Sequence, residues 1–365
     1  MVYIVIMAGG RGERFWPKST RRRPKQFHRI ASERTMVQET FSRVFPEFGK
    51  ERIFFVLGKH LTQSLLDQIP EIDDRNLIVE PAGKNTAPAI GLAAARLDKL
   101  DGEATMVVLT ADHLIRPKKE FLNAVNAAVE VANRGRLVTF GIKPIRPATE
   151  YGYVETRGRP QKTAGFHVYD VEKFTEKPDE STARRFLDSG RYLWNSGLFT
   201  FQAKEILGSI GRHMPGLYRS LMRIQGSMGG EDETRITEEE FSTIESVSID
   251  YGVMEKSDRI SCIEPGFLWD DMGSWRSLDR YGKKDGQGNV AEGDVVLVES
   301  KDNIVIGEDK SVIGEDKSVI ALIGVSGLIV VKEGNRLLVC HKDYDQRIKE
   351  ALERMSADEK LSNYL

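Results

Sequence analysis

The first third of the chain alternates short apolar runs with stretches that have helical spacing. The apolar runs are rich in β-branched residues and have the length of strands. They predict strands at Val2–Met7, Ile53–Leu57, Leu77–Val79, Thr105–Leu109 and Leu137–Gly141, and the stretches between them predict helices at Thr35–Val44, Leu61–Ile69, Asn85–Leu100 and Glu120–Asn133. Repeated β-α-β units indicate an α/β fold with a Rossmann-like, mainly parallel sheet that is flanked by helices. Ligands of such sheets bind at the carboxyl ends of the strands.

The pattern is less regular after Thr149. Two strands are expected at Tyr151–Glu155 and Gly165–Thr175, on either side of a polar loop at Arg157–Thr163. The remaining expectations are helices at Ser181–Ser189 and between Lys204 and Gln225, a mobile surface loop at Gly226–Arg235, and strands at Ser248–Met254 and Arg259–Glu264.

The chain changes character after Lys283–Asn289, which has the composition of a linker. Short apolar strands are expected at Val295–Val298, Ile304–Ile306, Val319–Ile323, Leu328–Val331 and Leu337–Val339, before a closing helix at Asp345–Met355. The unit GEDKSVI occurs twice, as Gly307–Ile313 and Gly314–Ile320. This short period predicts stacked β coils or a meander. The sequence therefore predicts a catalytic domain over residues 1–283 and a small β subdomain with a terminal helix over residues 290–365.

Composition excludes several classes of function. The 365 residues carry a formal charge of -2, which favours neither nucleic acid nor an anionic membrane as a partner. No apolar run reaches the roughly 18 residues of a membrane span, and the N-terminus does not have the pattern of a secretory signal. The two cysteines, Cys262 and Cys340, have no C-x-x-C partner, which disfavours a disulfide scaffold or a zinc site. We expect a cytoplasmic protein.

The stretch Met7–Phe27 follows the first strand and combines glycines with basic residues. Gly9, Gly10 and Gly12 allow a close backbone approach to a ligand, and successive N–H groups in such a loop bind anions. The stretch matches neither standard phosphate fingerprint, because Phe15 stands where a dinucleotide loop needs a glycine and Lys25 follows a proline. A tight surface turn with a solvated basic run is the alternative.

Together with six later stretches, this loop (G-G-x-G-x-R, then W-P and P-K-Q) resembles the sugar-nucleotidyltransferases, and among them the bacterial mannose-1-phosphate guanylyltransferases. The later stretches are Glu80–Pro88 (EPAGKNTAP), Thr110–His113 (TADH), Glu150–Tyr153 (EYGY), Phe174–Pro178 (FTEKP), Trp194–Gly197 (WNSG) and Trp269–Trp275 (WDDMGSW). The resemblance implies that mannose 1-phosphate attacks the α-phosphorus of GTP in a direct, Mg²⁺-assisted displacement, and that GDP-mannose and pyrophosphate are formed. The attacking phosphate is already an anion near neutral pH, because its second pKa is about 6, so no general base is needed.

The same resemblance implies the residues of a metal and phosphate site. Asp112 and Asp271 would hold Mg²⁺, which takes hard oxygen ligands. Asp270 is the alternative to Asp271, and Asp112 could instead cap a helix. Arg14 and Lys25 would contact the phosphates of GTP.

The nucleotide and sugar sites are implied in the same way. The backbone at Gly9, Gly10 and Gly12 would hold the nucleotide, and the carboxylate of Glu80 would accept the N–H donors of guanine. Asn85 and Thr86 lie beside it in sequence and could do no more than cap a helix. In the sugar site, Glu176 would accept mannose hydroxyls, Lys177 would meet the sugar phosphate, and Gly152 and Asn195 would contribute a close backbone and an amide. A plain surface charge pair is the alternative for Glu176 and Lys177.

Two other functions are compatible with parts of this pattern. A sister enzyme that uses dTTP, UTP, CTP or ATP with another sugar 1-phosphate would share the loop and both aspartates, but the Glu80–Pro88 and Trp269–Trp275 stretches favour the mannose branch. A catalytically silent regulatory homologue would bind the sugar nucleotide, but it would not need Arg14, Lys25 and the aspartates.

Some relatives carry a fused isomerase domain, for which the residues after Asn289 are too few. The β appendage suggests a homodimer.

Overall fold

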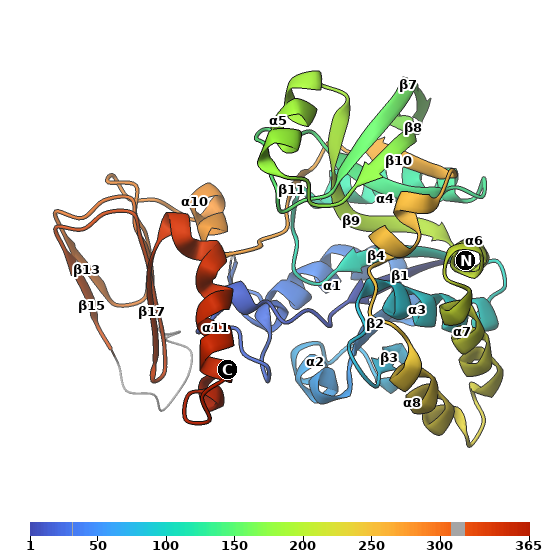
Figure 1. The fold of residues 1–365 in the computed structure, drawn as a ribbon, viewed down its shortest axis with the longest axis horizontal. Coiled ribbons are helices and arrows are strands. Elements are labelled where there is room, and N and C mark those ends of the chain that lie inside the picture. Colours follow the sequence, from blue (N-terminus) through green and yellow to red (C-terminus); the bar gives the residue numbers. More distant parts are fainter. Residues whose placement is uncertain (31, 308–317) are drawn as a thin grey trace. The chain divides into compact units, whose positions relative to one another are not determined.

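The computed structural model describes residues 1–30, 32–307 and 318–365, and its internal contacts divide them into two units (Figure 1). The first unit consists of Met1–Gly9, Thr40–Ala111 and Ile115–Trp269. The second unit consists of Gly10–Glu39, Asp112–Leu114 and Asp270–Leu365. From Gly10 onward, the glycine-rich loop therefore belongs with the C-terminal part of the chain, although it closely follows the first strand. The expected division at residues 283 and 290 stays a prediction about independent domains.

The first unit is built on a mixed sheet with the strand order β3-β2-β1-β4-β9-β6-β10-β8-β7. Its strands are β1 (Val2–Met7), β2 (Ile53–Gly58), β3 (Leu77–Glu80), β4 (Thr105–Thr110), β6 (Leu137–Ile142), β7 (Tyr153–Thr163), β8 (Phe166–Thr175), β9 (Tyr192–Gln202) and β10 (Ile260–Glu264). All of them except β8 and β9 run in the same direction. The expected mainly parallel α/β sheet is confirmed.

Helices follow most of the strands, as the β-α-β pattern predicts. They are α1 (Met36–Phe48), α2 (Thr62–Gln68), α3 (Thr86–Leu100), α4 (Lys118–Ala132), α5 (Glu180–Ser189), α6 (Ala203–His213), α7 (Pro215–Ser227), α8 (Glu233–Thr243) and α9 (Ile249–Gly252), and the short strands β5 (Leu114–Arg116) and β11 (Leu268–Asp270) lie outside the main sheet. None of the described helices is both long enough and apolar enough to cross a membrane.

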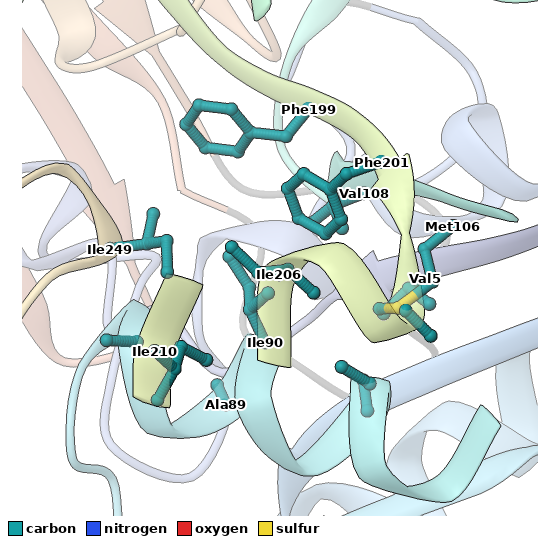
Figure 2. Close-up of a cluster of buried hydrophobic side chains, with 14 of the residues drawn as sticks. Val5, Ala89, Ile90, Met106, Val108, Phe199, Phe201, Ile206, Ile210 and Ile249 are labelled. Atoms are coloured by element: carbon teal, nitrogen blue, oxygen red, sulfur yellow. The ribbon is translucent and has the colours of Figure 1, made fainter. Parts of the chain in front are cut away.

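A cluster of buried apolar side chains on one face of the sheet packs its central strands against three helices (Figure 2). Side chains of β1, β4 and β9 pack there against α3, α6 and α9; the labelled ones are Val5, Ala89, Ile90, Met106, Val108, Phe199, Phe201, Ile206, Ile210 and Ile249. The alanine-rich α3 allows close packing, since a Cβ on Gly91 would lie 2.5 Å from Leu221 Cδ1. Each large apolar side chain buried in this way contributes about 1.5–3 kcal/mol.

Two sequence expectations in the first unit are wrong. The segment Arg157–Thr163 is not a loop but part of β7, which pairs with β8 through two register shifts. The segment has exposed charged residues and Pro160, and it lacks the alternation of apolar and polar residues that is typical of a strand. Its sequence pattern is therefore that of a loop. The expected strand Ser248–Met254 is helical instead, because the Ser248 side chain caps α9 by accepting from Tyr251 N.

The loop expected at Gly226–Arg235 is shorter than predicted. Helix α7 continues to Ser227 and α8 begins at Glu233, so only residues 228–232 form the connection between the two helices. Near the C-terminus, the helix expected at Asp345–Met355 begins as a 3-10 segment, and the α-helix α11 covers Ile348–Ser356.

The second unit contains a parallel β coil. The strands β12 (Val290–Glu292), β14 (Ile304–Ile306), β16 (Leu328–Glu333) and β17 (Arg336–His341) form one sheet, and β13 (Val295–Val298) pairs with β15 (Ile320–Ile323). The pairs β12–β14, β14–β16 and β13–β15 are parallel, so stacked coils rather than a meander are present, and one antiparallel hairpin, β16–β17, follows them.

Two buried asparagines join the successive coils of this β coil. Asn303 Nδ2 donates to Asn289 Oδ1 at 3.0 Å, and Leu328 N donates to Asn303 Oδ1 at 2.9 Å. The GEDKSVI repeat falls mainly on residues 308–317, outside the described residues. The short helix α10 (Leu278–Tyr281) connects the coil with the WDDMGSW stretch.

Candidate active site

The buried ammonium group of Lys25 is the centre of the candidate phosphate site in the second unit. Lys25 is 5% exposed, and its Nζ lies 2.8 Å from Asp112 Oδ2. The same nitrogen donates to the carbonyl oxygens of Asp271 at 3.1 Å and Met272 at 2.9 Å. Three stretches that are distant in sequence are therefore joined by one side chain. Burial alone would raise the pKa of Asp112, but the charge of Lys25 opposes it and helps to hold that pKa below its usual range.

The glycine-rich loop is shaped by its packing against Lys25 and the C-terminal part. Gly12 has a φ of 59°, and a Cβ added to it would lie 2.3 Å from Lys25 Cβ, so a larger residue would be excluded there. Phe15 is fully buried, with its ring centroid 4.8 Å from that of Trp275. The residue that breaks the dinucleotide fingerprint is therefore a core residue. It connects the loop with the WDDMGSW stretch.

Arg14 lies in the same loop and points toward that stretch. Its Nη1 donates to the carbonyl oxygen of Gly273 at 3.4 Å, while its buried Nε has no hydrogen-bond partner among the described residues. The guanidinium thus keeps donors for a further acceptor, which a phosphate oxygen could supply.

The two aspartates of the WDDMGSW stretch differ in their surroundings. Asp270 is 4% exposed and is fully engaged, since Oδ2 accepts from Arg280 Nε and Nη2 at 2.9 and 2.7 Å and Oδ1 accepts from Met272 N at 2.8 Å. Asp271 is half-buried, and its Oδ1 accepts from Gly273 N at 3.1 Å. Across the described residues, no three His, Cys, Asp or Glu side chains gather to hold a metal ion.

Glu80 forms a separate acidic site in the first unit, at the end of β3. It is 6% exposed, and its Oε1 accepts no hydrogen bond from any described residue. Burial raises its pKa to about 7. A Cβ on Gly9 would lie 3.6 Å from Glu80 Oε2, so the first glycine of the loop lies beside this carboxyl group. A buried acid with an unused oxygen can accept a ligand N–H.

Asn85 and Thr86 already have structural roles. Asn85 Oδ1 accepts from Thr86 N at 2.8 Å at the start of α3, and Thr86 Oγ1 accepts from Ile249 N at 2.8 Å. The first contact supports the capping alternative for Asn85, whereas Thr86 bonds to the start of α9. The contact of either residue with a nucleotide stays a prediction.

Glu176, Lys177, Gly152 and Asn195 gather in the first unit. Glu176 Oε1 accepts from Lys177 Nζ at 2.8 Å, whereas Glu176 Oε2 is buried without a hydrogen-bond partner in the described part of the chain. A Cβ on Gly152 would lie 2.4 Å from that oxygen, which explains the glycine. Asn195 N donates to Gly152 O at 2.8 Å. Glu176 is therefore largely covered, whereas the Lys177 side chain is 58% exposed, so both the sugar site and the surface charge pair stay open for these two residues.

The sequence analysis missed Asp250, which belongs to the same group. Asn195 Nδ2 donates to Asp250 Oδ1 at 3.1 Å, and burial together with the charge of Glu176 raises the pKa of Asp250 to about 7. The residue lies in α9, in the segment that was expected to be a strand. Only the Ser248 cap, followed by an acidic residue in the first turn, could have indicated a helix there.

Comparisons with known proteins show the family to which the chain belongs. A model of the nucleotidyl transferase family matches residues 3–287, and one of the MannoseP isomerase/GMP-like beta-helix domain matches residues 293–355. A mannose-1-phosphate guanylyltransferase from Salmonella muenchen is 39% identical over 359 residues, which cover 97% of this chain and 73% of the relative. Another from Escherichia coli is 36% identical over 363 residues, covering 99% of this chain and 75% of the relative.

A solved structure extends the similarity to the fold of nearly the whole chain. The crystal structure of a mannose-1-phosphate geranyltransferase from Thermus thermophilus has a TM-score of 0.85 and 33% identity, and the match covers 97% of this chain and 99% of that one. The matches to both family models and to relatives of this identity span both units. The chain belongs to the nucleotidyl transferase family and, within it, groups with the mannose-1-phosphate guanylyltransferases.

Proposed function

We propose that the chain transfers GMP from GTP to α-D-mannose 1-phosphate, giving GDP-mannose and pyrophosphate. The observation that carries the chemistry is the contact of Lys25 with Asp112 and with the carbonyl groups of Asp271 and Met272. It gathers the cation and both candidate metal ligands of the reaction in one unit. The names of the relatives supply the substrates.

The proposed catalysis consists of alignment and charge neutralisation. The sugar phosphate is itself the nucleophile, so the chain has to orient it in line with the α-phosphorus and to stabilise the charge on the leaving pyrophosphate. Arg14 and the N–H groups of the loop at Gly10 and Gly12 would bind the triphosphate. Lys25, whose three N–H donors bond to Asp112, Asp271 and Met272, would contribute its charge. Lys177 would hold the phosphate of the sugar.

A divalent metal ion is general in enzymes of this family, and we propose Mg²⁺. The donors fit this ion, because Mg²⁺ is usually held by one or two carboxylates while phosphates and water complete its shell. Asp112 and Asp271 would be those carboxylates. The full engagement of Asp270 with Arg280 and Met272 N favours Asp271 over it. When bound, the ion would neutralise phosphate charge.

Base and sugar would be recognised by the buried carboxyl groups of the first unit. Ionised Glu80 can accept from the N1–H and the exocyclic amine of guanine, whereas adenine presents an acceptor at N1. Glu176 Oε2 can accept from a sugar hydroxyl, since it accepts nothing within the described residues. A cytoplasmic location, a homodimer and a catalytic domain over residues 1–283 remain parts of the proposal.

The substrate assignment is tested by pyrophosphate release with mannose 1-phosphate and Mg²⁺. We expect GTP to be used with a kcat/KM at least about a hundredfold above that of ATP, UTP, CTP or dTTP, because a buried hydrogen-bonding group strongly rejects a base that cannot satisfy it. A preference for another triphosphate would overturn the guanine assignment. Release with glucose 1-phosphate at an equal rate would overturn the mannose assignment.

The metal assignment is tested with Asp112→Asn and Asp271→Asn. Each should lower kcat about a hundredfold or more, because a group that stabilises transition-state charge is lost. Asp270→Asn is the matched control: it should lower the melting temperature by breaking the Arg280 pair but retain turnover in the folded fraction. Wild-type activity in Asp271→Asn would move the ligand role to Asp270. Thermal unfolding of every variant separates lost activity from lost structure.

The role of Glu80 is tested by Glu80→Gln over pH. The folded pKa of about 7 exceeds the unfolded value of 4.5, so the wild type loses stability as pH rises from 4.5 to 7. Glu80→Gln should therefore raise the free energy of unfolding above pH 7 by something on the order of 3 kcal/mol. It should also raise the KM for GTP about tenfold or more, because a hydrogen bond to a charged acceptor is lost.

The wild-type KM for GTP should fall as pH rises through 7, when Glu80 ionises, and this dependence should disappear in Glu80→Gln. The exposed Glu231→Gln is the control and should change neither quantity. An unchanged KM for GTP in Glu80→Gln would remove Glu80 from base recognition.

A further inference from the structure

The side-chain amide of Asn195 is held in one orientation by groups on three sides. Gly197 N donates to Asn195 Oδ1 at 3.3 Å, and Thr139 Oγ1 donates to the same oxygen at 2.8 Å. Because a backbone N–H can only donate, the oxygen of the amide must face Gly197. The amide nitrogen then faces Asp250, to which it donates at 3.1 Å. The oxygen is thus occupied, and one N–H of Asn195 remains for a ligand.

Asp250 is a titratable carboxyl group that lies beside the charged pair of Glu176 and Lys177. Lys177 Nζ bonds to Glu176 Oε1, so these two groups balance each other. The other titratable groups of the surrounding elements are Tyr251, which interacts with Lys177, and Glu255, whose Oε1 accepts from Glu176 N at 3.1 Å. Burial and the neighbouring Glu176 raise the pKa of Asp250 to about 7, while Lys177 acts in the opposite direction.

We propose that Asp250 is a positioning residue of the sugar site: it holds the Asn195 amide for the sugar, and its charge sets how well the site accepts the dianionic phosphate of a sugar 1-phosphate. This inference rests on the proposed function and names a residue that no sequence motif indicated. While Asp250 is protonated, Glu176 and Lys177 leave this group of side chains neutral. Once Asp250 ionises, the group gains a net negative charge, which repels the incoming phosphate.

The sign of the pH dependence follows directly. Below about pH 7, Asp250 is mainly neutral and mannose 1-phosphate binds best; above it, the KM for mannose 1-phosphate should rise. A charge–charge repulsion of this kind should change KM about fivefold to tenfold between pH 6.5 and 8.5. The second pKa of the sugar phosphate, about 6, affects every variant in the same way.

The test measures the KM for mannose 1-phosphate at saturating GTP from pH 6.5 to 8.5. Asp250→Asn retains an oxygen acceptor for Asn195 but cannot ionise, so its KM should stay low and nearly constant. Asp250→Ala removes the acceptor, so its KM should be raised about tenfold at every pH through the loss of an ordered amide. Glu245→Gln changes an exposed carboxylate of the preceding segment and should follow the wild type. The KM for GTP should be the same in all four proteins at each pH.

The possible outcomes separate the inference from the function. If the wild type forms no GDP-mannose, the proposed function fails, and the inference fails with it. If the wild type turns over but Asp250→Asn shows the same rise of KM with pH, the function stands and the inference is overturned. If Asp250→Asn changes only kcat or the melting temperature, with an unchanged KM profile, Asp250 has a structural role alone and the inference is likewise overturned.

Discussion

The second unit depends on one buried cation, the ammonium group of Lys25. It is neutralised by Asp112 and solvated by the carbonyl groups of Asp271 and Met272, and it lies 5.4 Å from the centre of the Phe15 ring. A buried charge without partners would cost several kcal/mol, so these distant stretches must converge if the lysine is to be buried. Two further contacts hold the same stretches together. Gly12 leaves room for the Lys25 side chain, and Trp275 packs on Phe15. The positions of Lys25 and its partners are thereby fixed without a ligand, and preorganised polar groups are what the proposed displacement at phosphorus would require.

In the first unit, by contrast, two carboxyl groups are left incompletely hydrogen-bonded. Glu80 and Glu176 each bury an oxygen that has no hydrogen-bond partner among the described residues, and such groups lower the stability of the free protein. A ligand that brings a donor removes this cost, whereas one that brings an acceptor does not, so the unpaired oxygens select as well as bind.

Sequence reasoning succeeded where the local pattern and the packing agree. The strands β1, β2, β4 and β6 were evident because they are buried on both faces and read as continuous apolar runs. It failed at β7, where an exposed hairpin rich in charged residues has no apolar alternation, and at α9, where the Ser248 cap outweighs a strand-like pattern. The roles proposed for Lys25 and Asp112 come from family motifs, but their direct contact could not be predicted, since it depends on tertiary structure. Asp250 could not be found because its environment is formed by Asn195 of β9 and by Glu176 and Lys177 after β8, which are remote in sequence.

The central claim is that the chain supplies positioned charge rather than a covalent nucleophile. It is tested most directly by exchange of labelled pyrophosphate into GTP, measured with and without mannose 1-phosphate. A direct displacement requires the sugar phosphate, so we predict no exchange above background when the chain is given only GTP, Mg²⁺ and labelled pyrophosphate. Exchange should appear once mannose 1-phosphate is added. Exchange without the sugar phosphate, at a rate comparable to turnover, would reveal a guanylylated intermediate and contradict the claim.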